Sequence, residues 1–159
     1  METKEQKSLN TKRIVQDFYS SLASRELDAV TKNFADKIDW YIPGEQLLAP
    51  WLGRRTQRYE VKEFFEMLLQ NIESVSFDLE HIVSEDNFAV ATGHFVSKML
   101  ATGKIYEPPF SAHFTIQNDL IVRYRFLEDS NALVKALKIG LFYYNRIPAA
   151  IVLLIKNFM

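Results

Sequence analysis

The stretch at residues 74–86, SVSFDLEHIVSED, decides the fold, because its apolar residues alternate with polar ones. A period of two is typical of a β-strand with one buried face, and Glu85, Asp86 and Asn87 are typical turn residues. Similar strand-like stretches follow, with turns near Gly103 and at Asn118 and Asp119, at residues 88–100, 105–117 and 120–128. The sequence therefore predicts an antiparallel meander.

Helical patterns flank this meander. Ile14, Val15, Phe18, Tyr19 and Leu22 recur at helical spacing, and a second helical segment with Leu27, Val30 and Phe34 follows after a short break. A strand at residues 38–42 ends at Pro43, a loop of about a dozen residues follows, and a third helix begins near Val61. A short helix is predicted at residues 130–138. Helices first and strands later predict an α+β fold, with the helices covering one face of a curved sheet.

Composition excludes several classes of function. The chain has 159 residues, 19 Lys and Arg against 20 Asp and Glu, and no Cys. This balance provides no basic field for nucleic acid, and the lack of Cys excludes thiolate metal sites and thiol nucleophiles. Three scattered His residues do not predict a metal site, and we expect no cofactor. Without the features of a secretory signal at the N-terminus, the expected location is cytoplasmic.

The last residues, 139–159, form an apolar extension after a polar lead at residues 1–9 and a domain at residues 10–138. The longest uninterrupted apolar run, residues 147–155, is nine residues, whereas a membrane span needs roughly 20. We therefore expect no transmembrane span. A docked helix, an interfacial membrane anchor and a lid over a cavity are the alternatives, and docking is favoured because Ile151, Leu154, Ile155 and Phe158 share a helical stripe.

Several motifs together resemble a known family. They are Ile14 to Phe18 (IVQDF), Leu27-Asp28, Phe34 to Asp36 (FAD), Asp39 to Gly44 (DWYIPG), Pro50, Gly53, Phe64-Phe65 and Arg125 to Asp129 (RFLED). In this order and spacing they resemble the SnoaL-like and ketosteroid-isomerase-like members of the nuclear transport factor two-like superfamily. The resemblance implies a cone-shaped α+β barrel of cystatin-like type, with a ligand cavity capped by helices and a homodimer formed through the outer face of the sheet.

The catalytic positions of ketosteroid isomerases are lost here. By resemblance, the oxyanion Tyr falls at Phe18, the base at Ile42 and the protonated Asp at Ala112. None of these side chains takes a proton or donates a hydrogen bond. The resemblance therefore argues against that isomerase mechanism, and near Gly93, Phe95 and Phe126 the carboxylates and Arg of epoxide-opening relatives are also missing.

His94 is the acid/base candidate that remains. If Trp40 and Ile42 face the cavity, the same strand alternation turns His94 inward together with Val90, Thr92 and Val96. A His changes charge near neutral pH. The alternative is a hydrogen-bonded core His. Glu128 is expected on the same face as Tyr124 and Phe126, where it orients His94 or ionises at a surface rim.

The sequence leaves two function classes open. In the first, an apolar small molecule binds in the cone, with isomerase-, cyclase- or hydrolase-like chemistry at a carbonyl compound; in the second, the domain is a non-catalytic binding or dimerisation module. Three arginines of the expected mouth loop either recognise an anionic tail or are solvated: Arg54, Arg55 and Arg58. The predicted ligand pocket consists of Phe18, Trp40, Ile42, Trp51, Phe65, Thr92, His94, Tyr106, Ala112, Phe126 and Glu128.

Overall fold

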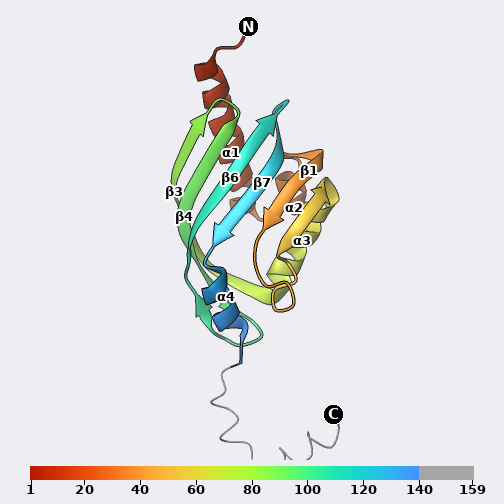
Figure 1. Ribbon diagram of the computed structural model, residues 1–159, viewed down its shortest axis with the longest axis vertical. Coiled ribbons are helices and arrows are strands. Elements are labelled where there is room, and N and C mark those ends of the chain that lie inside the picture. Colours follow the sequence, from red (N-terminus) through yellow and green to blue (C-terminus); the bar gives the residue numbers. More distant parts are fainter. Residues whose placement is uncertain (140–159) are drawn as a thin grey trace, which may run out of the picture.

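The computed structural model describes residues 1–139, and they form a curved, unclosed mixed sheet covered on its concave face by helices (Figure 1). The helices are α1 (Lys4–Ser24), α2 (Leu27–Thr31), α3 (Arg58–Asn71) and α4 (Ser130–Leu137). The strands are β1 (Phe34–Ile42), β2 (Gly53–Gln57), β3 (Ile72–Glu85), β4 (Phe88–Met99), β5 (Ile105–Tyr106), β6 (Pro109–Gln117) and β7 (Leu120–Glu128). The predicted α+β cone with N-terminal helices is confirmed.

The order of strands in the sheet is β2-β1-β7-β6-β4-β3, with β5 paired to β4. The predicted meander of β3, β4, β6 and β7 is antiparallel, but β1 lies parallel to β7. The sheet is therefore mixed rather than wholly antiparallel. The segment from β1 through α3 carries the chain to the far edge of the sheet. Strand β7 can therefore lie parallel to β1, as strands joined by a crossover connection do.

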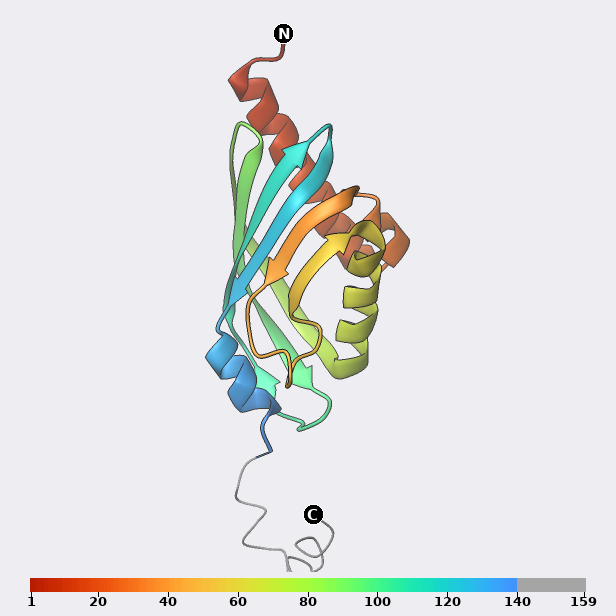
Figure 2. The same ribbon diagram turned by 45° about the vertical axis from the view of Figure 1, so that its right-hand side comes forward.

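The long helix α1 crosses the concave face of β3 and β4 and continues into α2, beside α3 (Figure 2). Its first turn is stabilised by a capping box, in which the Thr3 hydroxyl accepts from the Gln6 backbone N–H and the Gln6 side chain accepts from that of Thr3. Helix α1 therefore begins within the polar lead expected at residues 1–9. The apolar pattern starts only at Ile14 because the earlier turns lie near the sheet end, where Lys4 pairs with Glu85.

Several boundaries differ from the sequence-based expectation. Phe34 begins β1 instead of continuing a helix, and part of the expected mouth loop is the strand β2, which pairs with β1. Arginine-rich segments lack the β-branched signal of strands, and this explains why β2 was missed. Asp129 caps α4, because its Oδ1 accepts from the Ala132 backbone N–H at 2.9 Å.

The core consists largely of aromatic rings packed under the helices. Trp40, Phe18, Phe34 and Phe114 are fully buried, and Phe18 contacts Phe34 and Phe114 edge-on at 5.7 and 5.5 Å between ring centroids. Among residues 1–139, no helix is long and apolar enough to cross a membrane. Apart from Ile139, the apolar extension expected at residues 139–159 lies outside the described residues.

Candidate functional site: an aromatic cavity in the cone

A cavity of about 1400 Å³ lies between the concave face of the sheet, the C-terminal half of α1, and α3. From α1 and α3 it is lined by Tyr19, Leu22, Phe64, Phe65 and Leu68, and from the sheet by Phe77, Phe95, Ser97, Met99, Tyr124, Phe126 and Glu128. Most of this lining is aromatic or aliphatic. Concave apolar surfaces with few polar groups are typical of small-molecule sites.

Stacked rings from β3, β6 and β7 form the floor of the cavity. Phe110 stacks on Phe77 at 5.0 Å and on Phe126 at 5.2 Å between centroids, and Phe95 flanks Phe126 at 6.1 Å. Phe110 itself lies beneath the lining rings. This row gives the cavity an aromatic, apolar lining.

The ring row depends on Gly93, which pairs with Phe110 across β4 and β6. A Cβ atom at Gly93 would lie 2.9 Å from the Phe110 ring and 2.0 Å from the Asp78 backbone oxygen. The close approach of Asp78 comes just before a bulge in the pairing of β3 with β4, between Leu79 and His81. Only glycine therefore fits where the strand bends and the Phe110 ring crosses it.

The polar groups of the cavity gather at Glu128, which ends β7. Burial raises the pKa of the Glu128 carboxyl from 4.5 to about 7, and the neighbouring Tyr106 hydroxyl partly opposes that rise. Tyr106 is held in place because its hydroxyl donates to the Asp129 backbone oxygen at 2.9 Å. A carboxyl that changes charge near neutral pH inside an apolar cavity is a candidate acid/base group.

Two further tyrosines, Tyr19 and Tyr124, line the same cavity. Tyr124 is buried on the same face of β7, and its pKa is raised well above 10 by burial, with smaller contributions from the charges of Tyr19 and Glu128. The Tyr19 hydroxyl is buried and has no hydrogen-bond partner within residues 1–139. A buried hydroxyl left without a partner costs free energy, so it favours a ligand that brings a hydrogen-bonding atom to that point.

The structure divides the predicted pocket residues into three groups. Those that line the cavity are Ile42, Trp51, Phe65, Tyr106, Phe126 and Glu128. Phe18, Trp40 and Ala112 lie in the core and are fully buried. Thr92 and His94 lie on the convex face of the sheet.

The predicted inward orientation of His94 is wrong. On β4, the buried residues are Ala89, Ala91, Gly93, Ser97 and Met99, so the residues that alternate with them, His94 among them, face outward. His94 lies between two carboxylates of β3, with Nε2 3.2 Å from Asp78 and Nδ1 2.9 Å from Glu80, and about half of its side chain is exposed. The prediction carried over the phase of the strand with Trp40, whereas on β4 the small residues Ala89 and Ala91 face the core beneath α1.

The arginines predicted at the mouth do not point into the cavity. The Arg54 guanidinium lies over the Tyr41 ring at 4.5 Å, and that of Arg55 is buried over Phe64 at 4.9 Å. Arg58 pairs with Asp36 at 2.9 Å and donates to the Phe34 backbone oxygen. Each arginine contacts an element of the fold.

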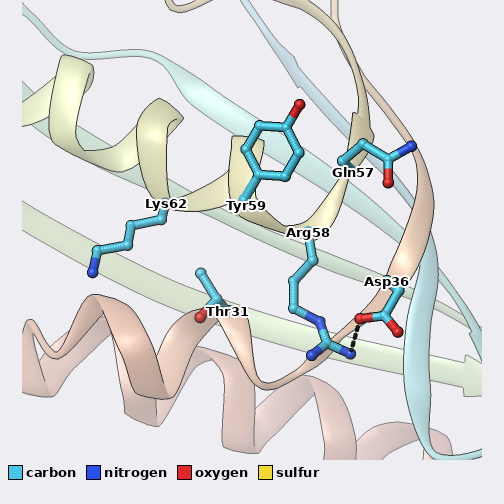
Figure 3. A pocket seen from close by; sticks show the side chains of 6 residues that line it. All are labelled: Thr31, Asp36, Gln57, Arg58, Tyr59 and Lys62. Carbon is cyan, nitrogen blue, oxygen red and sulfur yellow. Dashed lines mark ion pairs between the residues drawn. The ribbon is translucent and has the colours of Figure 1, made fainter.

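A second, smaller hollow of about 530 Å³ lies outside the cone, where α2, β1 and α3 meet. Figure 3 shows Arg58 reaching from the start of α3 to Asp36, while the Tyr59 ring points away from that ion pair. Lys62 at its rim pairs with Asp28 at 2.8 Å. The cations of this hollow are matched by local carboxylates, which favours a structural role.

Residues 1–139 contain no group of three or more His, Asp or Glu residues that could hold a metal ion.

The sequence analysis missed Tyr19 as a site residue, although it follows Phe18 on the apolar face of the first predicted helix. The hydroxyl could have identified Tyr19 as a site residue, because a side chain that only fills the core on that face needs no polar atom.

The curved sheet, the helices over its concave face and the apolar cavity between them define a protein of the NTF2-like fold. The chain belongs to the SnoaL-like domain family, whose model matches residues 15–124. This match confirms the resemblance drawn from the sequence motifs. A search of curated proteins finds no match.

Solved structures agree on the fold. An NTF2-like protein from Burkholderia xenovorans LB400 is 18% identical, with a TM-score of 0.75 over 82% of this chain and 98% of the other. TerC, crystallised with polyporic acid, is 13% identical, with a TM-score of 0.70 over 80% and 98%. A candidate polyketide cyclase from Pseudomonas putida KT2440 is 18% identical, with a TM-score of 0.65 over 80% and 98%. At these identities the likeness shows the fold alone.

Proposed function

We propose that this protein binds a flat, apolar small molecule that carries a carbonyl or hydroxyl oxygen, and that Glu128 exchanges a proton with it. The observation that carries the proposal is the position of the Glu128 carboxyl on a largely apolar cavity surface, with its pKa raised to about 7. A protein of the same fold, TerC, was crystallised with polyporic acid, which supports a small-molecule ligand.

The ligand class follows from the cavity's chemistry. The row of stacked rings favours a flat ring system, because aromatic faces pack best on one another in offset geometry. The unpartnered Tyr19 hydroxyl favours an oxygen that accepts a hydrogen bond. A hydrocarbon without oxygen would leave that hydroxyl unsatisfied, so it should bind more weakly.

The reaction class that fits is proton transfer next to a carbonyl. The Glu128 carboxylate would take a proton from the carbon beside the carbonyl, and the electron pair of that C–H bond would move into an enolate. Tyr19 would donate a hydrogen bond to the enolate oxygen, and return of the proton from Glu128 would complete an isomerisation or exchange. This assignment replaces His94, which lies outside the cavity.

The binding test uses 2-tetralone, a flat bicyclic ketone, and tetralin, the same skeleton without oxygen. We expect the quenching of tryptophan fluorescence to report binding, because Trp51 lines the cavity. Tyr19→Phe removes the hydroxyl and keeps the ring, and it should weaken 2-tetralone binding about 5- to 10-fold while leaving tetralin unchanged. If Tyr19→Phe binds each ligand as tightly as the wild-type protein does, the assigned role of Tyr19 fails.

The chemistry test follows exchange of the α-hydrogens of 2-tetralone in D2O by NMR. The protein should accelerate exchange, Glu128→Gln should abolish the acceleration, and His94→Gln should retain it. Binding without any acceleration would favour the second function class, a non-catalytic binder, which the apolar residues at Phe18, Ile42 and Ala112 also favour. Lack of binding by every ketone of this type would contradict the proposal as a whole.

We also propose a homodimer and a cytoplasmic location. The convex face offers Val83, Phe88 and Leu127 as exposed apolar side chains beside charged ones. Light scattering of the purified protein should give twice the chain mass, and Leu127→Glu should lower it. An unchanged dimer mass in that variant would place the contact elsewhere.

A further inference from the structure

The mouth of the cone cavity is edged by large apolar side chains that are only half covered. Leu69 of α3, Val75 and Phe77 of β3, and Leu100 after β4 line the cavity and are 45% to 58% exposed. Exposed apolar patches that line a groove mark a surface that another molecule or segment covers.

The cavity is also larger than a small molecule needs. Its volume of about 1400 Å³ exceeds the roughly 300–1000 Å³ that is typical of ligand pockets. A ligand on the ring row near Glu128 would leave the rim from Leu69 to Val75 in contact with water. Something else therefore fits beside it.

We propose that the chain's own residues 147–158 cover this mouth. The segment reads IPAAIVLLIKNF, with nine apolar residues in succession at 147–155. Placed in a helix, Ile151, Leu154, Ile155 and Phe158 share one stripe, whose apolar chemistry matches that of the rim. The inference extends beyond the small-molecule site, and the exposed apolar rim supports it with or without a bound ligand.

The described chain ends beside the cavity. Leu133 of α4 lines it, so the last helix is part of its wall. The C-terminal end of α4 is fastened to the turn after β4, because the Thr102 hydroxyl donates to the Ala136 backbone oxygen at 2.6 Å and the Lys104 ammonium donates to that of Lys135 at 3.0 Å. Leu100 of the same turn edges the mouth, so the last described helix ends close to its rim.

The segment is long enough to reach the whole rim. Between Ile139 and Ile151 lie residues 140–150, which extend over about 40 Å at most. The opposite side of the mouth is formed by α3, whose 14 residues span only about 21 Å. Both edges therefore lie within reach of the chain's own C-terminus.

Disulfide trapping tests this arrangement directly, because the chain contains no Cys that would interfere. In the full-length protein, Val75→Cys is combined in turn with Cys at each of the four stripe positions, Ile151, Leu154, Ile155 and Phe158. The matched control replaces Val75→Cys with Val83→Cys, because Val83 is on the same strand and is 68% exposed, but lies on the convex face.

At least one Val75 pair should form an intramolecular disulfide ten times faster than its Val83 counterpart under mild oxidation, as read by mass spectrometry. Equal rates at the two positions for all four pairs would overturn the proposal. A disulfide between two chains would overturn it in favour of a segment that covers a second copy.

A membrane surface is the remaining alternative to which so apolar a segment could bind. The full-length protein should not sediment with vesicles of phosphatidylcholine and phosphatidylglycerol at a 3:1 ratio. Sedimentation that is lost in the Ile151→Glu, Ile155→Glu double variant would overturn the proposal. Neither experiment uses 2-tetralone, so failure here and failure of the small-molecule function are distinguishable.

Discussion

The two faces of the sheet place their ionisable groups in opposite environments. On the convex face, His94 lies between Asp78 and Glu80, and all three are about half exposed. On the concave face, Glu128 lies alone among aromatic rings, and its pKa is raised to about 7. His94 has the side chain with the more suitable ordinary pKa, but only Glu128 faces a cavity. Environment, rather than residue type, decides which group can serve as acid or base.

The largest effect should come from removing a ring of the concave face. Trp40→Ala should lower the free energy of unfolding by about 3–5 kcal/mol, because Trp40 is fully buried between Tyr124 and Phe64. The neighbouring Tyr41 is on the other face under Arg54, so Tyr41→Ala should cost about 1 kcal/mol or less. Urea denaturation of both variants provides the comparison, and equal losses would contradict the division into two faces.

The pH dependence of stability should separate Glu128 from His94. Because the folded pKa of Glu128 is about 7 and its ordinary value is 4.5, the unfolded chain loses this proton first as the pH rises. The free energy of unfolding should therefore fall between about pH 4.5 and 7, by up to about 3 kcal/mol, and stay level above. Urea denaturation from pH 4.5 to 8 should show this fall in the wild type and in His94→Gln, but not in Glu128→Gln. A fall of equal size in Glu128→Gln would assign it to another group.

Gly93→Ala should disturb the packing around β4, where the strand meets β3 on one side and the Phe110 ring on the other. The added Cβ would meet the Asp78 backbone oxygen and the Phe110 ring, so we expect a loss of about 1–3 kcal/mol. The control is Gly103→Ala, where nothing lies within 4 Å and only the positive φ of +70° opposes a side chain, at a cost of about 1 kcal/mol. Thermal denaturation should rank the two variants in that order. The reverse order would mean that the strands separate easily at this bulge.

The smallest effect is expected at His94. Exposed ion pairs contribute little, so His94→Gln should change the free energy of unfolding at pH 6 by about 0.5 kcal/mol or less. Binding of 2-tetralone should also be unchanged, because the side chain is on the far side of the sheet from the cavity. A tenfold loss of binding in this variant would restore the original prediction from the sequence.

The errors in predicting the site have one physical origin. Alternation along β4 was recognised correctly, but its phase was wrong, because the small residues Ala89, Ala91 and Gly93 carry little hydrophobic signal although they face the core. A one-residue change of phase moves every side chain of a strand to the other face. The bulge between Leu79 and His81 shifts the phase once more on β3, and no residue pattern in that stretch announces it.

The sequence by itself determined most of the order of elements, apart from β2, together with the cone-shaped fold and the family, because hydrophobic periodicity and turn residues act over a few neighbouring positions. It also placed Glu128 with Tyr124 and Phe126, because that strand is regular. Only the tertiary structure decided that β1 lies parallel to β7, that His94 faces solvent and that Tyr19 meets the cavity without a partner. Those facts depend on how closely α1 approaches the sheet and where the strands bend, and such distances arise from packing between residues far apart in the chain.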